Sequence, residues 1–447
     1  MTLVVGWIAC FFCDFWLLQE RKFVYTDAVK VVNGLKSMAE LDYHYGIKMR
    51  IYPSNKQKEI IKINSNISRT VYNKLVGIDK EIYRLKQIGI GLKIIQNRIS
   101  ELIERKNIRE LSNHYQYMEN KKIDSLAKAN AKMSYLKAWA MFRKVHKAGT
   151  PKFHKKNYSE KYQTSCQYSK KSKMNVYTGS VRFLDDKHIK VPKLGKLRIK
   201  GYKKEIFHDK QNIRIGTVTL CKDPCNRYFI SLQLSSDTPF VERKVKTGSN
   251  IGIDLNTENF LTTSDNVVID NPRFYRKMKK RLSKERRILS RRMNRAKKEH
   301  RKLRESKNYQ KQRLLVSKLN TKIRNQRNNF LNVLSTKLIN NHDLIVAEEL
   351  RSSNMLKNHV LAMSISDVGW RTFLNMLAYK ADLYGRKFLT IDPKNTTQTC
   401  SDCGHILSGA DKLTLTDRHW TCPVCHKHHL RDHNAAINIL NKGLTKQ

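Results

Sequence analysis

Hydrophobic residues follow different periods along this chain, and each period predicts a different kind of element. From residue 46 to 52 they alternate with polar residues, which predicts a short strand. From about residue 58 to 145 they recur every three or four positions, which predicts a helical block. From residue 176 to 234 the alternation returns, broken by turn residues, and this pattern predicts a small β-barrel domain.

The helical block has clear boundaries in the sequence. Ser54 and Gln57 fit a capping box at its beginning, and Gly149-Thr150-Pro151 breaks the helical pattern at its end. We expect the large hydrophobic residues near its end to be core residues rather than platforms that stack on bases; they are Leu126, Met133, Leu136, Trp139 and Phe142.

The second half of the chain alternates strands with helices. Strands are predicted at residues 251–254, 259–269 (a hairpin), 343–348 and 387–392, and helices at 273–327, from Trp370 onward and at 434–441. This order of elements is typical of a mixed α/β domain.

The positive charge of the chain is far larger than solubility requires. Lys and Arg number 88 against 38 Asp and Glu, a net charge of +50. Arg273–Arg327 alone holds 24 Lys or Arg against three Glu, and Lys187–Lys204 holds eight Lys or Arg. Because cations that meet phosphates release condensed counterions, a nucleic acid is the simplest partner; a ribosomal-type or merely very soluble surface is the alternative. No helix-turn-helix pattern stands out, so direct readout of a long site is not expected.

Four of the nine cysteines have the spacing of metal ligands. Cys400 and Cys403 form one Cys-x-x-Cys pair, and Cys422 and Cys425 form a second pair after a gap of 18 residues. Two such turns aim four thiolates at one point and leave no open position, so the sequence predicts a structural zinc site. Two disulfides or free thiols are the alternative. Several histidines crowd the same region: His405, His419, His426, His428, His429 and His433. We expect them at the surface or near phosphates; the alternative is that one of them replaces a cysteine as a ligand.

Three carboxylates stand at the ends of predicted elements of the α/β domain. Asp254 and Glu348 each end a strand, and Asp432 precedes a helix. Taken singly, they could be a turn residue, a solvated acid beside Glu349 and a helix N-cap. Together they suit two-metal cleavage of phosphodiesters, which needs converging carboxylates that hold two cations about 4 Å apart.

A series of motifs surrounds these acids: Gly252-Ile253-Asp254, Asn271–Tyr275, Ile345–Leu350, Ser364–Trp370, Thr399–His405, Trp420–Cys425 and Arg431–Leu440. In this order they resemble the motifs of the TnpB-type (OrfB) proteins of bacterial insertion sequences, from about residue 46 to the end. Asn256 and Leu430 depart from the family pattern, in which Gly and Asp are common, and Glu349 stands where the family usually has Asp.

The resemblance implies an RNA-guided, metal-dependent DNA endonuclease that helps an insertion sequence persist. The family is related to type V CRISPR effectors and is often labelled transposase. The resemblance further implies that Asp254, Glu348 and Asp432 are catalytic and bind Mg²⁺ or Mn²⁺. It also implies that the partners are a guide RNA encoded near the element and double-stranded and single-stranded DNA.

Residues 1–45 lie outside the resemblance and form an atypical N-terminal extension. For the rest of the chain, the resemblance implies a multi-domain α/β architecture with these parts: a β-barrel, wedge-like domain at 46–57 and 150–245, a helical recognition insertion at 58–149, a RuvC-like, RNase H-type nuclease domain at 246–447, and a zinc ribbon inserted at 395–430. Two other functions use the same features. One is a transposase with strand-transfer activity, and the other is a nuclease-dead, RNA-guided repressor. The presence of all three acids weighs against the repressor.

The N-terminal residues differ from the rest of the chain. Leu3–Leu18 is apolar apart from Asp14, but 16 residues are few for a membrane span, and no basic residue precedes them. Because the cysteine pattern favours a reducing compartment, we expect a bacterial cytoplasmic, nucleoid-associated protein with no membrane partner. We also expect the functional protein to start near Met38, with the preceding residues dispensable.

Overall fold

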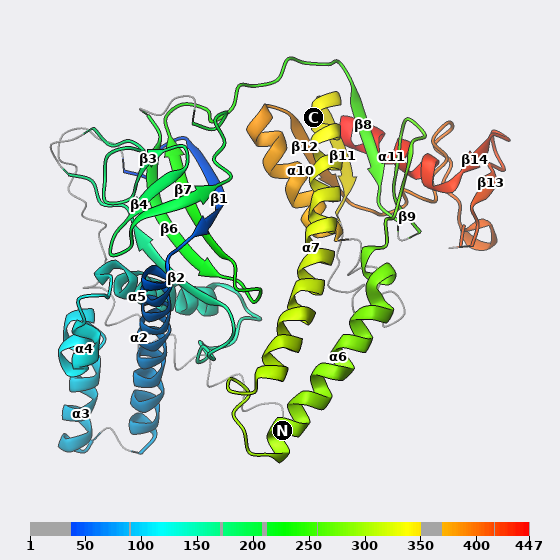
Figure 1. Cartoon of the computed structure of the whole chain (residues 1–447). Helices are drawn as coiled ribbons and strands as arrows, with labels where there is room; N and C mark the ends of the chain where they lie inside the picture. The colour runs from blue at the N-terminus through cyan, green and yellow to red at the C-terminus, as the bar shows by residue number, and fades with distance from the viewer. Residues whose placement is uncertain are drawn as a thin grey trace. The chain divides into compact units, whose positions relative to one another are not determined.

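The computed structural model describes residues 37–88, 91–169, 173–207, 212–256, 258–349, 369–414 and 416–446. They form two compact units, which are described separately (Figure 1). The first unit runs to Cys221 and includes Tyr228–Phe240, and the second comprises Lys222–Arg227 and the chain from Val241. The apolar stretch Leu3–Leu18 and most of the motif Ser364–Trp370 lie outside the described residues. Within the described part of the chain, no helix is long and apolar enough to cross a membrane.

A seven-stranded sheet forms the β part of the first unit. Its strands are β1 (Tyr43–Tyr52), β2 (Glu160–Ser165), β3 (Arg182–Asp185), β4 (His188–Val191), β5 (Gly195–Lys200), β6 (Arg214–Lys222) and β7 (Tyr228–Ser236), in the order β2-β6-β7-β1-β5-β4-β3. The central strand β1 pairs antiparallel with β5 and β7. It turns Ile47, Met49 and Ile51 into the core, as its period of two predicts.

This sheet is a half-barrel rather than the closed barrel that the alternation predicted. Its edge strands β2 and β3 do not pair with each other among the described strands. β3 has only four residues, and β2 packs against the helices α2 (Asn55–Ile88) and α5 (Ser125–Lys144). Helices therefore cover the edge that another strand would close in a complete barrel.

The helical block consists, in the described residues, of α2, α3 (Lys93–Glu104), α4 (Ile108–His114), the short 3₁₀ helix η2 (Gln116–Glu119) and α5. The capping box is present: Ser54 N donates to Gln57 Oε1 at 2.8 Å, and Gln57 N donates to Ser54 Oγ at 3.3 Å. The prediction that Met133 and Leu136 of α5 are core residues was wrong, because they are 47% and 40% exposed. α5 instead buries Tyr135 and two alanines, because its large apolar residues are spread around the helix and do not form one stripe.

The second unit contains a mixed five-stranded sheet in the order β10-β9-β8-β11-β12. Its strands are β8 (Asn250–Asp254), β9 (Asn259–Thr263), β10 (Val268–Asp270), β11 (Leu344–Glu348) and β12 (Lys387–Ile391). β11 runs parallel to both β8 and β12, whereas β8, β9 and β10 are joined as antiparallel hairpins. This is the mixed α/β arrangement that the order of elements predicted.

Helices cover both faces of this sheet. The core on one face contains residues of α7 (Lys307–Asn341) and α10 (Trp370–Tyr384), together with Ile345 and Ala347 of β11. The core on the other face joins Leu344 and Val346 to Ile439 of α11 (Arg431–Leu444). β11 is thus buried on both faces, which explains why it reads as a continuous apolar run.

The basic segment forms the predicted helical hairpin, in which α6 (Phe274–Lys298) packs against α7. Their contact buries Leu282, Val316, Leu319 and Ile323. α7 continues well beyond the predicted end, because its apolar stripe goes on to cover the sheet. The cysteine region contains the 3₁₀ helix η3 (Gly409–Asp411) and a two-stranded sheet of β13 (His419–Thr421) and β14 (His428–Leu430).

Candidate functional site

Two carboxylates end neighbouring parallel strands of the second unit. β8 and β11 pair up to the residue before each acid, so Asp254 and Glu348 lie side by side at the carboxyl ends of the strands. Side chains alternate along a strand, and Gly252 and Val346, two residues earlier, both face α11. Asp254 and Glu348 are therefore directed to the face of the sheet that α11 covers.

α11 brings the third carboxylate to the same edge of the sheet. The helix begins at Arg431, so Asp432 lies within its first turn and is not the N-cap residue. α11 approaches β8 so closely that a Cβ atom on Gly252 would lie 2.2 Å from the carbonyl oxygen of Ala436. Only glycine permits this approach. Gly252 therefore lets the first turn of α11, with Asp432, come close to the strand ends.

Burial raises the pKa of two of these acids, Asp254 and Glu348. Asp254 is 7% exposed. Burial, followed by the charges of Glu348 and Asp432, raises the pKa of Asp254 well above its usual range. Burial also raises the pKa of Glu348, against the opposing hydrogen bond from Thr396. Carboxylates that repel one another in this way favour a bound cation, and their hard oxygen donors fit Mg²⁺ or Mn²⁺.

Polar neighbours of Asp432 were not identified from the sequence. Asn256 donates from Nδ2 to Asp432 Oδ2 at 3.3 Å, and Arg418 Nη1 lies at the same distance from that oxygen. Arg431 donates from Nη2 to Asp432 Oδ1 at 3.1 Å. In the sequence, the departure from the family pattern at Asn256 was the signal for such a neighbour, because Asn256 supplies an amide that a glycine would lack.

A chain of hydrogen bonds connects the acids to the cysteine region. Thr396 donates from Oγ1 to Glu348. On α11, the buried Asn434 donates from Nδ2 to Thr399 O at 2.7 Å, and its Oδ1 accepts from Ser401 N at 2.8 Å. These bonds fix the segment that enters the first cysteine pair against the helix that carries Asp432. Sequence reasoning noted Thr399, Ser401 and Asn434 only as members of motifs, and it did not identify Thr396.

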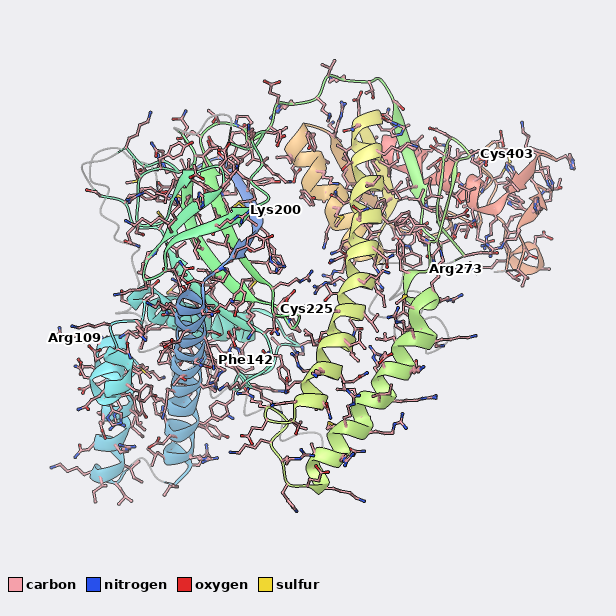
Figure 2. The ribbon with its side chains drawn as sticks, in the orientation of Figure 1. Arg109, Phe142, Lys200, Cys225, Arg273 and Cys403 are labelled. Carbon is pink, nitrogen blue, oxygen red and sulfur yellow. The ribbon has the colours of Figure 1, made fainter. Side chains whose placement is uncertain are left out.

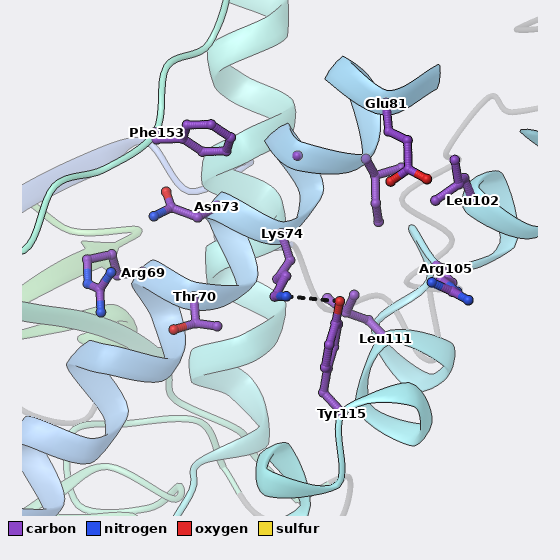
Figure 3. Close-up of a pocket in the computed structure, with 12 residues that line it drawn as sticks. Arg69, Thr70, Asn73, Lys74, Glu81, Leu102, Arg105, Leu111, Tyr115 and Phe153 are labelled. Atoms are coloured by element: carbon purple, nitrogen blue, oxygen red, sulfur yellow. Dashed lines mark hydrogen bonds between the residues drawn. The ribbon is translucent and has the colours of Figure 1, made fainter. Parts of the chain in front are cut away.

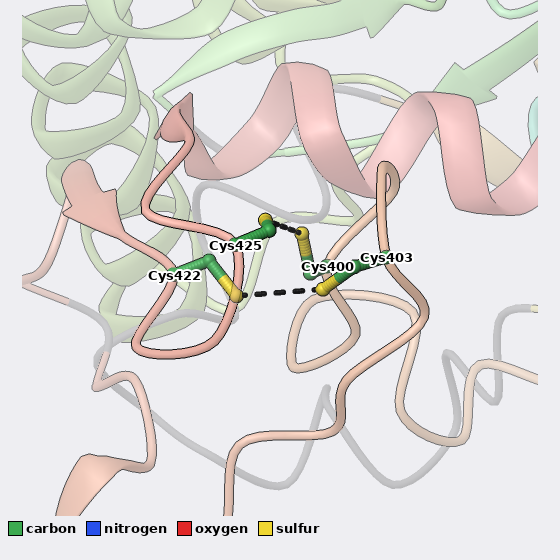
Figure 4. A group of neighbouring side chains, drawn as sticks. All are labelled: Cys400, Cys403, Cys422 and Cys425. Carbon is green, nitrogen blue, oxygen red and sulfur yellow. Dashed lines mark hydrogen bonds between the residues drawn. The ribbon is translucent and has the colours of Figure 1, made fainter.

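The four predicted zinc ligands converge (Figure 4), with all four Sγ atoms within 4.8 Å of one another. The Sγ atoms of Cys400 and Cys425 are 3.6 Å apart, and so are those of Cys403 and Cys422. A zinc–sulfur bond of about 2.3 Å corresponds to a tetrahedral edge of about 3.8 Å, so this donor set fits a zinc ion.

The two cysteine pairs are built in the same way. The carbonyl oxygens of Cys400 and Cys422 accept from the N–H groups of Gly404 and His426, four residues later, at 2.9 and 3.0 Å. Gly404 and His426 both adopt the left-handed conformation, with φ of 75° and 56°. Both pairs therefore close with the same turn, and the second pair makes it with a residue less suited than glycine to this conformation.

His429 is not the surface group that the sequence predicted. It is 7% exposed, and its ring centroid lies 4.7 Å from that of Trp420. Its Nε2 lies 3.2 Å from Cys400 Sγ and 3.5 Å from a carboxylate oxygen of Asp402. An N–H group at this nitrogen would support the Cys400 thiolate, as groups outside the ligand shell commonly do in metal sites.

The α6–α7 hairpin presents many cations. α6 buries Leu282 and Ala296, and most of its Lys and Arg side chains project outward from Arg273 onward (Figure 2). A helix that packs by one stripe and is basic elsewhere is typical of a surface that contacts phosphates.

The outward face of the first unit's sheet combines cations with aromatic rings. The guanidinium of Arg50 lies 5.1 Å from the centroid of Phe229, and that of Arg198 lies 5.7 Å from the centroid of Tyr52. Lys200, opposite Arg50 on β5, adds a further exposed cation. Such a face can contact both phosphates and bases.

Three parts of the chain match known families. Residues 230–359 match a family described as "Probable transposase", and residues 370–439 match the "Cas12f1-like, TNB domain". Residues 44–87 match a "Helix-turn-helix domain". In this structure, that last region is β1 followed by one continuous helix, α2, so it contains no turn between two helices.

Proteins with related sequences carry consistent names. A "Putative RNA-guided DNA endonuclease" of Streptomyces pristinaespiralis is 37% identical over 229 residues, which are 51% of this chain and 53% of that protein. The "Putative RNA-guided DNA endonuclease InsQ" of Escherichia coli (strain K12) is 28% identical over 274 residues, which are 58% of this chain and 63% of that protein. The chain thus matches between half and two thirds of the length of these relatives.

A solved structure shares the fold. The "Cryo-EM structure of the Cas12f1-sgRNA-target DNA complex" aligns with a TM-score of 0.50 and 14% identity, over 90% of this chain and 99% of that chain. At this identity the likeness shows the fold alone. It agrees with the predicted multi-domain architecture at the level of mixed α/β content.

Proposed function

We propose that this chain, a relative of the TnpB-type proteins of insertion sequences, is an RNA-guided, divalent-metal-dependent DNA endonuclease. The observation that carries the proposal is the meeting of Asp254, Glu348 and Asp432 at one edge of the sheet, from three segments far apart in the sequence. The names of the relatives and the two basic surfaces support the same function.

Each part of the molecule would have a separate role. The five-stranded sheet with α7, α10 and α11 would form the RuvC-like nuclease domain, and residues 395–430 would form its zinc ribbon. The half-barrel would be the wedge-like domain, and the α2–α5 helices the recognition insertion.

The three acids would hold Mg²⁺ or Mn²⁺ through their carboxylate oxygens. When bound, such ions activate water and stabilise the leaving oxygen in phosphodiester hydrolysis. The chain's own contribution is to position the acids. Thr396 orients Glu348, while Arg431 and Asn256 orient Asp432 through one oxygen each. Burial of Asp254 keeps competing water away from its carboxylate.

Guidance by RNA would use the basic surfaces. The hairpin and the half-barrel face are both cationic, which suits a chain that holds a structured RNA and a heteroduplex at the same time. In such systems base pairing reads the sequence, while the protein reads shape and a short flanking motif.

The test is cleavage of a target plasmid by the purified chain with its co-purified RNA. We expect site-specific cutting in Mg²⁺ that stops after chelation and after ribonuclease treatment at high salt. Site-specific cutting by the RNA-free chain would contradict guidance. Joined DNA products would favour a strand-transferring transposase, and binding without cutting would favour a repressor.

A further inference from the structure

A cavity of about 500 Å³ lies in the helical part of the first unit (Figure 3). It is lined by residues of α2, α3 and α4 and by Arg105, Tyr115 and Phe153. Its volume is within the usual range of small-ligand sites. The roles proposed above assign nothing to it.

Two of the cations that line this cavity have no carboxylate partner among the described residues; the third, Arg105, is paired with Glu101. Glu81, the acidic residue in the lining, is already paired with Arg98 at 2.7 Å. Lys74 donates from Nζ to the hydroxyl of Tyr115 at 3.0 Å, and this is a neutral partner. In the part of the chain that the structure describes, Arg69 makes no hydrogen bond or ion pair. Two cations beside a neutralised acid favour an anionic ligand, and a phosphate suits both side chains.

An exposed aromatic ring lines the same cavity as these cations. Phe153 is 48% exposed, and Lys80 Nζ lies 4.2 Å from its centroid. The next residue is anchored: Asn73 accepts from His154 N at 2.7 Å and donates to His154 O at 3.0 Å. The His154 ring stacks on Tyr72 with centroids 3.8 Å apart and planes 5° apart. An exposed ring next to a residue anchored in this way is a suitable platform for a nucleic acid base.

We propose that this cavity binds one unstacked nucleotide of a single strand, with the base against Phe153 and the phosphate at Arg69 and Lys74. The inference rests on the proposed function for the class of ligand and adds a defined site to it. Base and phosphate are common to RNA and DNA, so the test uses one probe of each.

The first experiment irradiates the full chain at 254 nm with the oligonucleotides U20 or dT20 and maps the nucleotide adducts by mass spectrometry. We expect an adduct on the peptide that contains Phe153, together with adducts on α6 and α7. The probe that gives the cavity adduct identifies the strand as RNA, DNA or both. Arg69→Gln should reduce the cavity adduct about tenfold relative to the α6–α7 adducts, because it removes a charge-assisted hydrogen bond. Lys137→Ala, at an exposed lysine of α5 outside the cavity, should leave this ratio unchanged.

Adducts on α6 and α7 without one at the cavity would overturn this inference and leave the proposed function standing. The absence of all adducts would overturn both. If Arg69→Gln gives the wild-type ratio of the cavity adduct to the α6–α7 adducts, the proposed phosphate contact at Arg69 is wrong.

A second experiment separates stacking from charge by measuring the dissociation constant for U20 over a series of salt concentrations. Phe153→Leu should weaken binding by about 5- to 100-fold with an unchanged salt dependence, because it removes a stacked base. Phe153→Trp should bind like the wild type. Arg69→Gln should reduce the slope of log Kd against log salt by about 0.7, the value for one phosphate contact on a single strand. If both Phe153→Leu and Arg69→Gln behave like Lys137→Ala, the cavity is not a nucleotide site.

Discussion

The two candidate metal sites of the second unit are built in opposite ways. The thiols come from two short segments within residues 400–425, and each segment is closed by its own backbone hydrogen bonds. The carboxylates come from two strands and a helix spread over residues 254–432, and only the packing of α11 on the sheet brings them together. A site made by local turns can be predicted from spacing, whereas a site made by packing needs the fold.

The two sites are nevertheless connected. Asn434 holds the segment beside Cys400 against α11, and Thr396 of the same region contacts Glu348. A change in the connecting residues should therefore be felt at both sites, and the predictions below test how far the two are independent.

The largest effect is expected from Cys403→Ser. A structural zinc contributes on the order of 10 kcal/mol to the folding of such a module, so the variant should lose its metal and residues 395–430 should become sensitive to protease. Elemental analysis should give one zinc per wild-type chain. Cys166→Ser, a change at a buried cysteine of the first unit, should keep the zinc. A wild-type chain without zinc and with paired thiols would contradict the prediction.

The next effect concerns the acids. Asp254→Ala, Glu348→Ala or Asp432→Ala should each reduce Mg²⁺-dependent cleavage by at least about 100-fold, because each unseats a cation worth several kcal/mol in the transition state. Nucleic acid binding and zinc content should not change. Glu349→Ala is the matched control, because Glu349 is the exposed neighbour of Glu348. Normal cutting by Asp432→Ala would refute the assignment. Normal cutting by Glu348→Ala but not by Glu349→Ala would assign the role of the second metal-binding acid to Glu349.

A smaller effect should come from breaking the connection. Asn434→Ala leaves Ser401 N without its buried partner, at a cost of about 1–3 kcal/mol, whereas Thr399 O keeps the hydrogen bond from Asn438 Nδ2 at 2.6 Å. We expect faster loss of zinc to a chelator and about tenfold slower cleavage. Asn441→Ala, at an exposed position of the same helix, should change neither. If only one of the two readouts responds, the sites are independent.

The smallest effect is the pH dependence of the stability of the metal-free chain. The pKa of Asp254 is raised in the folded state above its unfolded value of about 3.9, so the folded chain binds this proton more tightly. Stability should therefore fall as pH rises from about 4 through the raised pKa, and Mg²⁺ should oppose the fall. The Asp254→Asn variant lacks this pH-dependent loss of stability. The difference between its Tm and that of the metal-free wild type should therefore increase with pH. Parallel pH profiles of Tm would show that Asp254 is not the titrating group.

Sequence patterns predicted the elements of the second unit closely, because each element is recognisable from a few consecutive residues. β11 reads as an apolar run, and the hairpin of α6 and α7 follows from its stripe of leucines. Predictions failed where a residue's environment depends on distant packing. Met133 and Leu136 look like core residues but face outward, and His429 looks like a surface residue but packs against Trp420 and Cys400.

By itself, the sequence determined the four thiols as candidate zinc ligands, the three acids as candidate metal ligands and the basic segments, because spacing, residue type and charge are local properties. Only the tertiary structure decided which acids meet and what orients them. Gly252 allows α11 to approach β8, and this approach places Asp432 beside Asp254 and within reach of Asn256. The nucleotide-sized cavity was also invisible in the sequence, because Arg69 and Phe153 are far apart along the chain and are brought together by the bonds between Asn73 and His154.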